Sequence, residues 1–182
     1  MIACNPSQLL LVTTTCQYNI IQNLCKSINI RSLKVLQIPV ANKRLQVCEA
    51  IPLVETSITV IADDDIIWPS KVIPWLLAPF EDKKIDGVGT RQRVKRLKTK
   101  SLTKQCYNWL NAAYITRRNF EISATHFING GTSYMSGRTY TFITAIIQAP
   151  DFLIYYGNKK WRKHNLKANN NNFITRWLVS HQ

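Results

Sequence analysis

Residues 57–69 read Ser-Ile-Thr-Val-Ile-Ala-Asp-Asp-Asp-Ile-Ile-Trp-Pro, an apolar, largely β-branched run that ends in three consecutive carboxylates. The chain has only 10 acidic residues, so a cluster of three is unusual for it. Like charges this close repel one another unless a cation compensates them. In an extended segment the side chains alternate between faces, so Asp63 and Asp65 are expected to point the same way. Two carboxylates there suit a hard divalent cation, which prefers oxygen ligands.

The place of these acids along the chain supports a functional reading. Open α/β sheets bind their ligands at the carboxyl ends of strands, where Asp63 and Asp65 are predicted to lie. A structural alternative is that one Asp caps the helix expected to begin near Pro69 while the others are solvated.

The chain has 182 residues, 46% of them hydrophobic, which suits one globular domain with a sizeable core. Its net charge of +14 favours anionic partners: nucleotide phosphates, an acidic membrane surface or nucleic acid. Eleven Lys or Arg residues and a single acid, Asp86, lie between Lys83 and Arg118. This basic region is either a solvated face or a contact for a membrane surface or polyphosphate. No aromatic residue interrupts the run 91–98, and no nucleic-acid motif is recognised, so nucleic-acid binding is the weaker alternative.

The five cysteines lack the spacing of a zinc site or of a secreted disulfide framework, so reduced thiols facing the cytosol are expected. They are Cys4, Cys16, Cys25, Cys48 and Cys106. No run of 18 or more apolar residues is present, and the N-terminus lacks the basic-then-apolar order of a signal peptide.

Strands alternate with helices along the chain, which predicts an α/β fold with a mainly parallel sheet. Strands are expected at 9–12, 35–38, 58–62 and 87–90. Helices are expected after residue 15, at 42–50, 70–77, 103–121 and 139–148, shortly after Pro150, and at 172–181. Gly130 and Gly131 fall in a predicted loop or strand edge, where the backbone can approach a ligand closely.

In its order of motifs the chain resembles glycosyltransferase family 2, and more specifically the fungal polysaccharide-synthase branch related to hyaluronan, cellulose and chitin synthases. The matching stretches are 40–44, 61–69, 87–94, 117–121, 130–138 and 172–177. An Asp-x-Asp pair alone is a weak signal, but this ordered set covers nearly the whole chain.

The resemblance implies a GT-A-like, Rossmann-like fold that binds a UDP-sugar for inverting transfer to a growing polysaccharide at the cytosolic face of a membrane. Asp63 and Asp65 would match the pair that holds Mg²⁺ or Mn²⁺ on the diphosphate, where the cation offsets charge on the leaving group. The family's substrate-binding positions would fall on Asp63, Asp65, Gly130, Gly131, Ser133 and Arg138. Arg138 would be an anion contact, or alternatively a surface or helix-capping arginine.

One departure from the family bears directly on catalysis. The family carries consecutive Asp residues before its final helix, one of which is the general base for the acceptor hydroxyl. The matching position here is Asn171, with Asn170 beside it. An amide accepts a hydrogen bond but does not take a proton at neutral pH, and a positioned base contributes about 10²–10⁴-fold to rate. Transfer by this chain is therefore expected to be weak or absent.

Other parts of the family pattern are not found in these 182 residues. The first nucleotide-binding strand would lie before Met1, and the membrane-spanning helices and the Gln-x-x-Arg-Trp motif are missing. Arg176 and Trp177 repeat the end of that motif, but Phe173 stands where the Gln belongs. Residues 1–182 are thus expected to be a single, partial catalytic domain that is incomplete at its N-terminus. A catalytically silent remnant is the main alternative.

Overall fold

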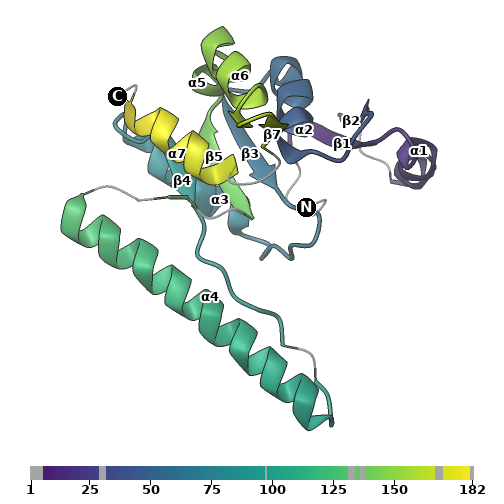
Figure 1. Cartoon of the computed structure of the whole chain (residues 1–182). Helices are drawn as coiled ribbons and strands as arrows, with labels where there is room; N and C mark the ends of the chain where they lie inside the picture. Colours follow the sequence, from purple (N-terminus) through teal and green to yellow (C-terminus); the bar gives the residue numbers. More distant parts are fainter. Residues whose placement is uncertain are drawn as a thin grey trace.

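The computed structural model describes residues 6–28, 32–96, 98–130, 134–135, 138–166 and 170–180. It is a mixed α/β structure with small sheets (Figure 1). Its first sheet pairs β1 (Leu9–Thr14) with β2 (Leu33–Ile38) in parallel, with Leu11 opposite Val35. Helix α1 (Tyr18–Lys26) connects the two strands. Helix α2 (Lys43–Ala50) follows, and the Asn42 side chain caps it by accepting a hydrogen bond from the Arg44 amide at 2.9 Å.

The second sheet has the order β3-β5-β4, and both of its pairings are antiparallel. Its strands are β3 (Ile58–Ala62), β4 (Gly87–Gly89) and β5 (Thr139–Ile143). Helix α3 (Val72–Leu77) lies between β3 and β4 in the chain, and 3-10 turns cover Ile51–Leu53 and Ala78–Glu81. Among the described residues, parallel pairing, predicted from the sequence for most of the sheet, is therefore found only between β1 and β2.

The predicted helix at 139–148 was wrong in its first half. Residues Thr139–Ile143 form β5, the central strand of the second sheet, and only Thr144–Gln148 form a helix, α5. Thr, Tyr, Phe and Ile are strand-favouring residues, and pairing on both edges decides for a strand where the local pattern was ambiguous.

The remaining elements largely follow the prediction. Helix α6 (Pro150–Gly157) starts at the expected proline, and α7 (Asn170–Ser180) begins two residues earlier than expected. A small hairpin of β6 (Lys160–Trp161) and β7 (His164–Asn165) was not predicted. The long helix α4 (Leu102–Asn129) extends eight residues beyond its predicted end and runs diagonally away from the body of the molecule (Figure 1).

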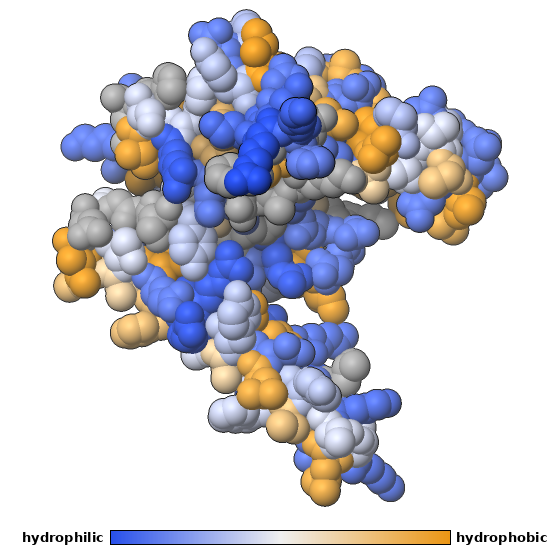
Figure 2. Space-filling view, viewed as in Figure 1, coloured by the Kyte–Doolittle hydropathy of each residue, from blue (hydrophilic) through white to orange (hydrophobic). Residues whose placement is uncertain are grey.

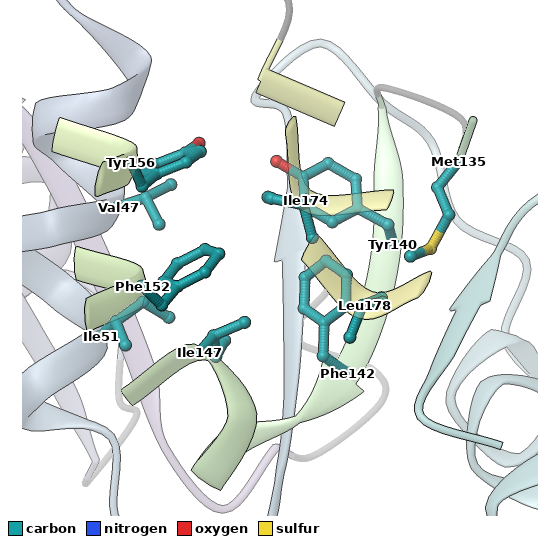
Figure 3. Close-up of a cluster of buried hydrophobic side chains, with 10 residues drawn as sticks. All are labelled: Val47, Ile51, Met135, Tyr140, Phe142, Ile147, Phe152, Tyr156, Ile174 and Leu178. Carbon is teal, nitrogen blue, oxygen red and sulfur yellow. The ribbon is translucent and has the colours of Figure 1, made fainter. Parts of the chain in front are cut away.

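The core lies between α2, α6 and α5 on one side and β5 with α7 on the other (Figure 3). Its buried members are Val47, Ile51, Met135, Tyr140, Phe142, Ile147, Phe152, Tyr156, Ile174 and Leu178. Gly87 on β4 allows α7 to pack closely, because a Cβ there would lie 2.9 Å from Leu178 Cδ1. Within the described residues, no helix is both long and apolar enough to cross a membrane.

Candidate functional site

Strand β3 ends at Ala62, and the three acids follow it directly. Asp63 continues the extended chain, whereas Asp64 and Asp65 form a turn. The expectation that Asp63 and Asp65 share a face of an extended segment therefore fails, since the strand has ended before Asp65. The alternative that one acid caps the next helix is not seen either. Helix α3 has Lys71 at its N-cap position, with no side-chain capping hydrogen bond.

Arg138 contacts two of the three acids: its backbone bonds to the backbone of Asp63, and its side chain bonds to the side chain of Asp65. In the register of β3 and β5, Ala62 lies opposite Thr139, so Asp63 and Arg138 come next along the two strands. The Asp63 amide donates to the Arg138 carbonyl at 2.9 Å, and Arg138 Nη1 donates to Asp65 Oδ2 at 2.8 Å. Arg138, expected from the resemblance to contact an anion, here has the Asp65 carboxylate as its partner, and its role toward a substrate stays a prediction.

Asp63 has a second cationic neighbour, Lys43, whose Nζ forms an ion pair with Asp63 Oδ1. Lys43 is the first residue of α2, which the Asn42 cap positions, and its Nζ lies 5.9 Å from the centroid of the Tyr140 ring. Lys43 was not among the site residues predicted from the sequence. The available signal was its place in the matching stretch 40–44.

Arg44, the next residue, fixes helix α2 against α6 and α7. It is buried, its Nη1 donates to the Tyr156 carbonyl at 3.0 Å, and its guanidinium lies 4.8 Å from the Tyr156 ring and 5.4 Å from the Phe173 ring. Burial lowers the pKa of Arg44, while the nearby Tyr156 and Cys48 oppose that shift. The start of α2, and with it Lys43, is held by this packing.

The two carboxylates fit a divalent cation that takes its other ligands from a substrate and from water. Asp63 and Asp65 supply carboxylate oxygens, and both side chains reach the surface, with exposed fractions of 27% and 62%. In the described residues no group of three or more His, Cys, Asp or Glu side chains could hold a metal ion. Mg²⁺ is commonly bound by one or two carboxylates together with substrate phosphates and water, and two acids suffice for that arrangement.

A cavity of about 480 Å³ lies elsewhere, between β4, α4 and α7. Polar and charged residues line much of it: Asp86, Arg91, Asn119, Ser123, His126 and Thr175. Asp63 and Asp65 are not among its lining residues. Gly130 is, and it also ends α4 in the left-handed conformation (φ 69°) that favours glycine. Gly131 and Ser133, also expected to bind substrate, lie outside the described residues.

Asn170 and Asn171 form the first turn of α7. Asn170 is buried, and its Oδ1 has no hydrogen-bond partner among the described residues. Asn171 is half-buried, and its carbonyl accepts from Thr175 Oγ1 at 2.8 Å. The same Thr175 oxygen accepts from the Met135 amide at 2.9 Å, which ties α7 to the segment before β5. The amides thus lie at a helix start packed on the second sheet.

The family model and similar known proteins both indicate a family 2 glycosyltransferase. The model of the family described as "Glycosyltransferase like family 2" matches residues 4–182. A "Type 2 glycosyltransferase" of Gibberella zeae is 57% identical over the whole chain, and one of Pyricularia oryzae is 49% identical over the whole chain. An "NDP-glycosyltransferase ltbB" of Aspergillus luteorubrus is 28% identical over 68% of the chain and is covered over 31% of its own length.

The chain covers 35% of the Gibberella protein and 38% of the Pyricularia protein, so it spans about a third of the length of the curated relatives it matches. The family match itself extends over nearly every residue. This chain therefore belongs to the glycosyltransferase-like family 2.

Proposed function

We propose that residues 1–182 are part of the catalytic domain of a polysaccharide synthase, and that they bind a UDP-sugar together with Mg²⁺ or Mn²⁺. The observation that carries this proposal is the convergence of Asp63, Asp65, Lys43 and Arg138 at the end of β3. Two carboxylates matched by two cationic side chains provide ligands for a metal ion and contacts for a diphosphate.

In the proposed complex Asp63 and Asp65 hold the divalent cation, whose positive charge offsets the charge that develops on the leaving diphosphate. Lys43 and Arg138, released from the two acids, then contact phosphate oxygens. This exchange is feasible because partly exposed ion pairs contribute little free energy, typically about 0–1 kcal/mol. The family implies a GT-A fold and a sugar acceptor, here proposed as a growing polysaccharide at the cytosolic face of a membrane.

Inverting transfer requires the acceptor hydroxyl to lose a proton as it attacks the anomeric carbon. The base position falls on Asn171, whose amide orients a hydroxyl but does not take its proton. Transfer is therefore slowed by about 10²–10⁴-fold relative to a chain with a carboxylate there.

This amide pair favours a second candidate function, a catalytically silent domain that binds the nucleotide sugar without transferring it. In the described part of α7, residues 170–180, the sequence Asn-Asn-Asn-Phe-Ile-Thr-Arg-Trp-Leu-Val-Ser contains no carboxylate. Both candidates share the metal and nucleotide site, and they differ in turnover.

Titration calorimetry of the chain with UDP, with and without Mn²⁺, tests the shared site. Mn²⁺ should be required for tight binding, and Asp63→Ala and Asp65→Ala should each weaken it about tenfold or more. Asp82→Ala is the matched control, because Asp82 is an exposed acid on another loop whose carboxylate accepts from the Lys84 amide. Metal-independent binding, or equal affinities in all three variants, would refute the proposal. Sugar release from a UDP-sugar then separates the two candidates.

A further inference from the structure

Helix α4 presents its apolar face to solvent. Leu102, Trp109, Phe120 and Phe127 follow one another at intervals of 7, 11 and 7 residues, each close to a whole number of helical turns. Their exposed fractions are 81%, 62%, 72% and 90%. Cys106, Ala113 and Ala124 complete the same face, and Leu110 and Ile128 lie beside it. A helix of 28 residues is about 42 Å long, so this is a long apolar stripe.

A different face of α4, to one side of the apolar stripe, is turned toward the rest of the molecule. Asn119 Nδ2 donates to the Gln92 carbonyl at 2.7 Å, and the Gln92 amide donates to Asn119 Oδ1 at 3.2 Å. Ser123 and His126 on the same face line the cavity against β4 and α7. These contacts fix the rotation of the helix, so the outward direction of the apolar stripe is set by hydrogen bonds.

The charges around this stripe are almost all positive. Residues 91–129 contain nine Lys or Arg residues and one acid, Glu121, which pairs with Arg117 at 2.9 Å. Six of the nine are exposed on the segment that runs beside α4 (Figure 1): Arg91, Arg93, Lys95, Arg96, Lys98 and Lys100. In Figure 2 orange groups alternate with blue ones along this arm of the molecule.

A second hollow, of about 390 Å³, lies between this segment and the first turns of α4. Lys98, Thr99, Lys104, Tyr107 and Asn108 line it, so two lysines lie beside this hollow, and their charge suits a phosphate-bearing headgroup nearby.

We propose that the outward face of α4 lies in the plane of an anionic lipid surface, with its aromatic and aliphatic side chains in the headgroup–acyl boundary and the 91–100 segment over the headgroups. Helices that bind this way combine Trp, Phe and Leu on one face with a basic polar face. A second copy of the chain is a poorer occupant, because two such basic helices would repel one another. The proposal concerns a surface separate from Asp63 and Asp65, so it can fail without the nucleotide site failing.

Vesicle co-sedimentation of the chain tests this inference, with phosphatidylcholine vesicles that either contain or lack phosphatidylserine. Trp109→Ser, Phe120→Ser and Phe127→Ser, combined, should weaken partitioning onto anionic vesicles by about tenfold or more. The matched control combines Ile20→Ser, Leu24→Ser and Trp75→Ser, which alter similarly exposed side chains on α1 and α3 and should leave partitioning within about twofold of the original. Circular dichroism checks that each variant is folded.

A charge variant tests the role of the basic segment. Arg93→Gln, Lys95→Gln and Arg96→Gln, combined, should lower the anionic preference by about fivefold for each charge removed. Equal partitioning onto both kinds of vesicle would overturn the inference, as would unchanged binding of the α4 variant. Light scattering measures whether the chain forms a dimer. A dimer that depends on α4 and does not bind vesicles would also overturn the inference, because the apolar stripe would then be the contact with a second copy.

Discussion

Arg138 donates through Nη1 to Asp65 Oδ2 at 2.8 Å, although the two residues are 73 positions apart in the chain. The side chains are 47% and 62% exposed, so this ion pair contributes at most about 1 kcal/mol. Backbone hydrogen bonds hold the end of β3 to the start of β5, so this weak side-chain contact can be replaced by a divalent cation without separating the strands. Lys43 and Asp63 form the equivalent pair on the other acid.

Arg138→Gln should raise the affinity for Mn²⁺ alone by about two- to fivefold, because it removes a cation that competes for Asp65. The same variant should weaken the binding of Mn²⁺ with UDP, where Arg138 is proposed to contact phosphate. Electron paramagnetic resonance of free Mn²⁺ gives the first affinity and calorimetry the second. Arg117→Gln, which breaks the exposed pair with Glu121 on α4, is the control. Weaker binding of Mn²⁺ alone to Arg138→Gln would argue against the competition.

Asn171→Asp should raise sugar transfer by about 10²–10⁴-fold if this position is that of the general base. The assay follows release of UDP from a UDP-sugar in the presence of acceptor. Asn172→Asp serves as the control, since Asn172 is an exposed neighbour on the same helix turn. Equal activity in the two variants would place the base elsewhere.

Asn170→Asp should instead lower the free energy of unfolding by a few kcal/mol, because it buries a carboxylate at a position that is 6% exposed.

Tyr140→Phe should leave the stability unchanged or raise it by about 1 kcal/mol, because the buried Tyr140 hydroxyl has no hydrogen-bond partner among the described residues. Figure 3 shows this hydroxyl, and that of Tyr156, at the same end of the core. Urea unfolding at neutral pH measures the change. The exposed Tyr155→Phe is the matched control. A loss above 1 kcal/mol would reveal a hydrogen bond to the hydroxyl.

Tyr140→Phe should also change how the free energy of unfolding depends on pH above pH 10. Burial, with smaller contributions from Tyr156 and Asp63, raises the pKa of Tyr140 well above its usual 10.0. In the unfolded chain Tyr140 ionises near pH 10, whereas in the folded chain it stays neutral to higher pH. The stability is therefore intact below pH 10 and falls as the pH rises toward the folded pKa. Tyr140→Phe should make this fall shallower, and an identical pH profile would contradict the assignment.

Gly87→Ala should destabilise the fold by about 1–3 kcal/mol. The new methyl group would lie 2.9 Å from Leu178 Cδ1 and 3.0 Å from Met135 Cε, so α7 or its side chains must shift. Thermal or urea unfolding gives the cost. Leu178→Val in the same chain removes the closest atom and should recover part of the loss. If Gly87→Ala is as stable as the original, α7 does not pack on β4 as closely as described.

Much of the local structure was predictable from the sequence because it depends on short-range patterns. The β-branched run before Asp63 predicted β3 with its observed bounds, Asn42 marked the start of α2, and Pro150 marked the start of α6. The motif order also identified the family, which the family match over residues 4–182 confirms. The signals for β3, α2 and α6 lie within a few residues of the element that they specify, whereas the family signal depends on the order of motifs along the whole chain.

Only the tertiary structure determined which residues far apart in the sequence contact one another. Residues 139–143 became a strand because β3 and β4 pair on its two sides, and this pairing places Arg138 beside Asp63 and Asp65. Lys43 reaches Asp63 from a helix 20 residues earlier. The polar face of α4 turns inward because Asn119 bonds to the backbone of Gln92. Such contacts depend on how strands and helices meet in space, and no pattern of neighbouring residues specifies them.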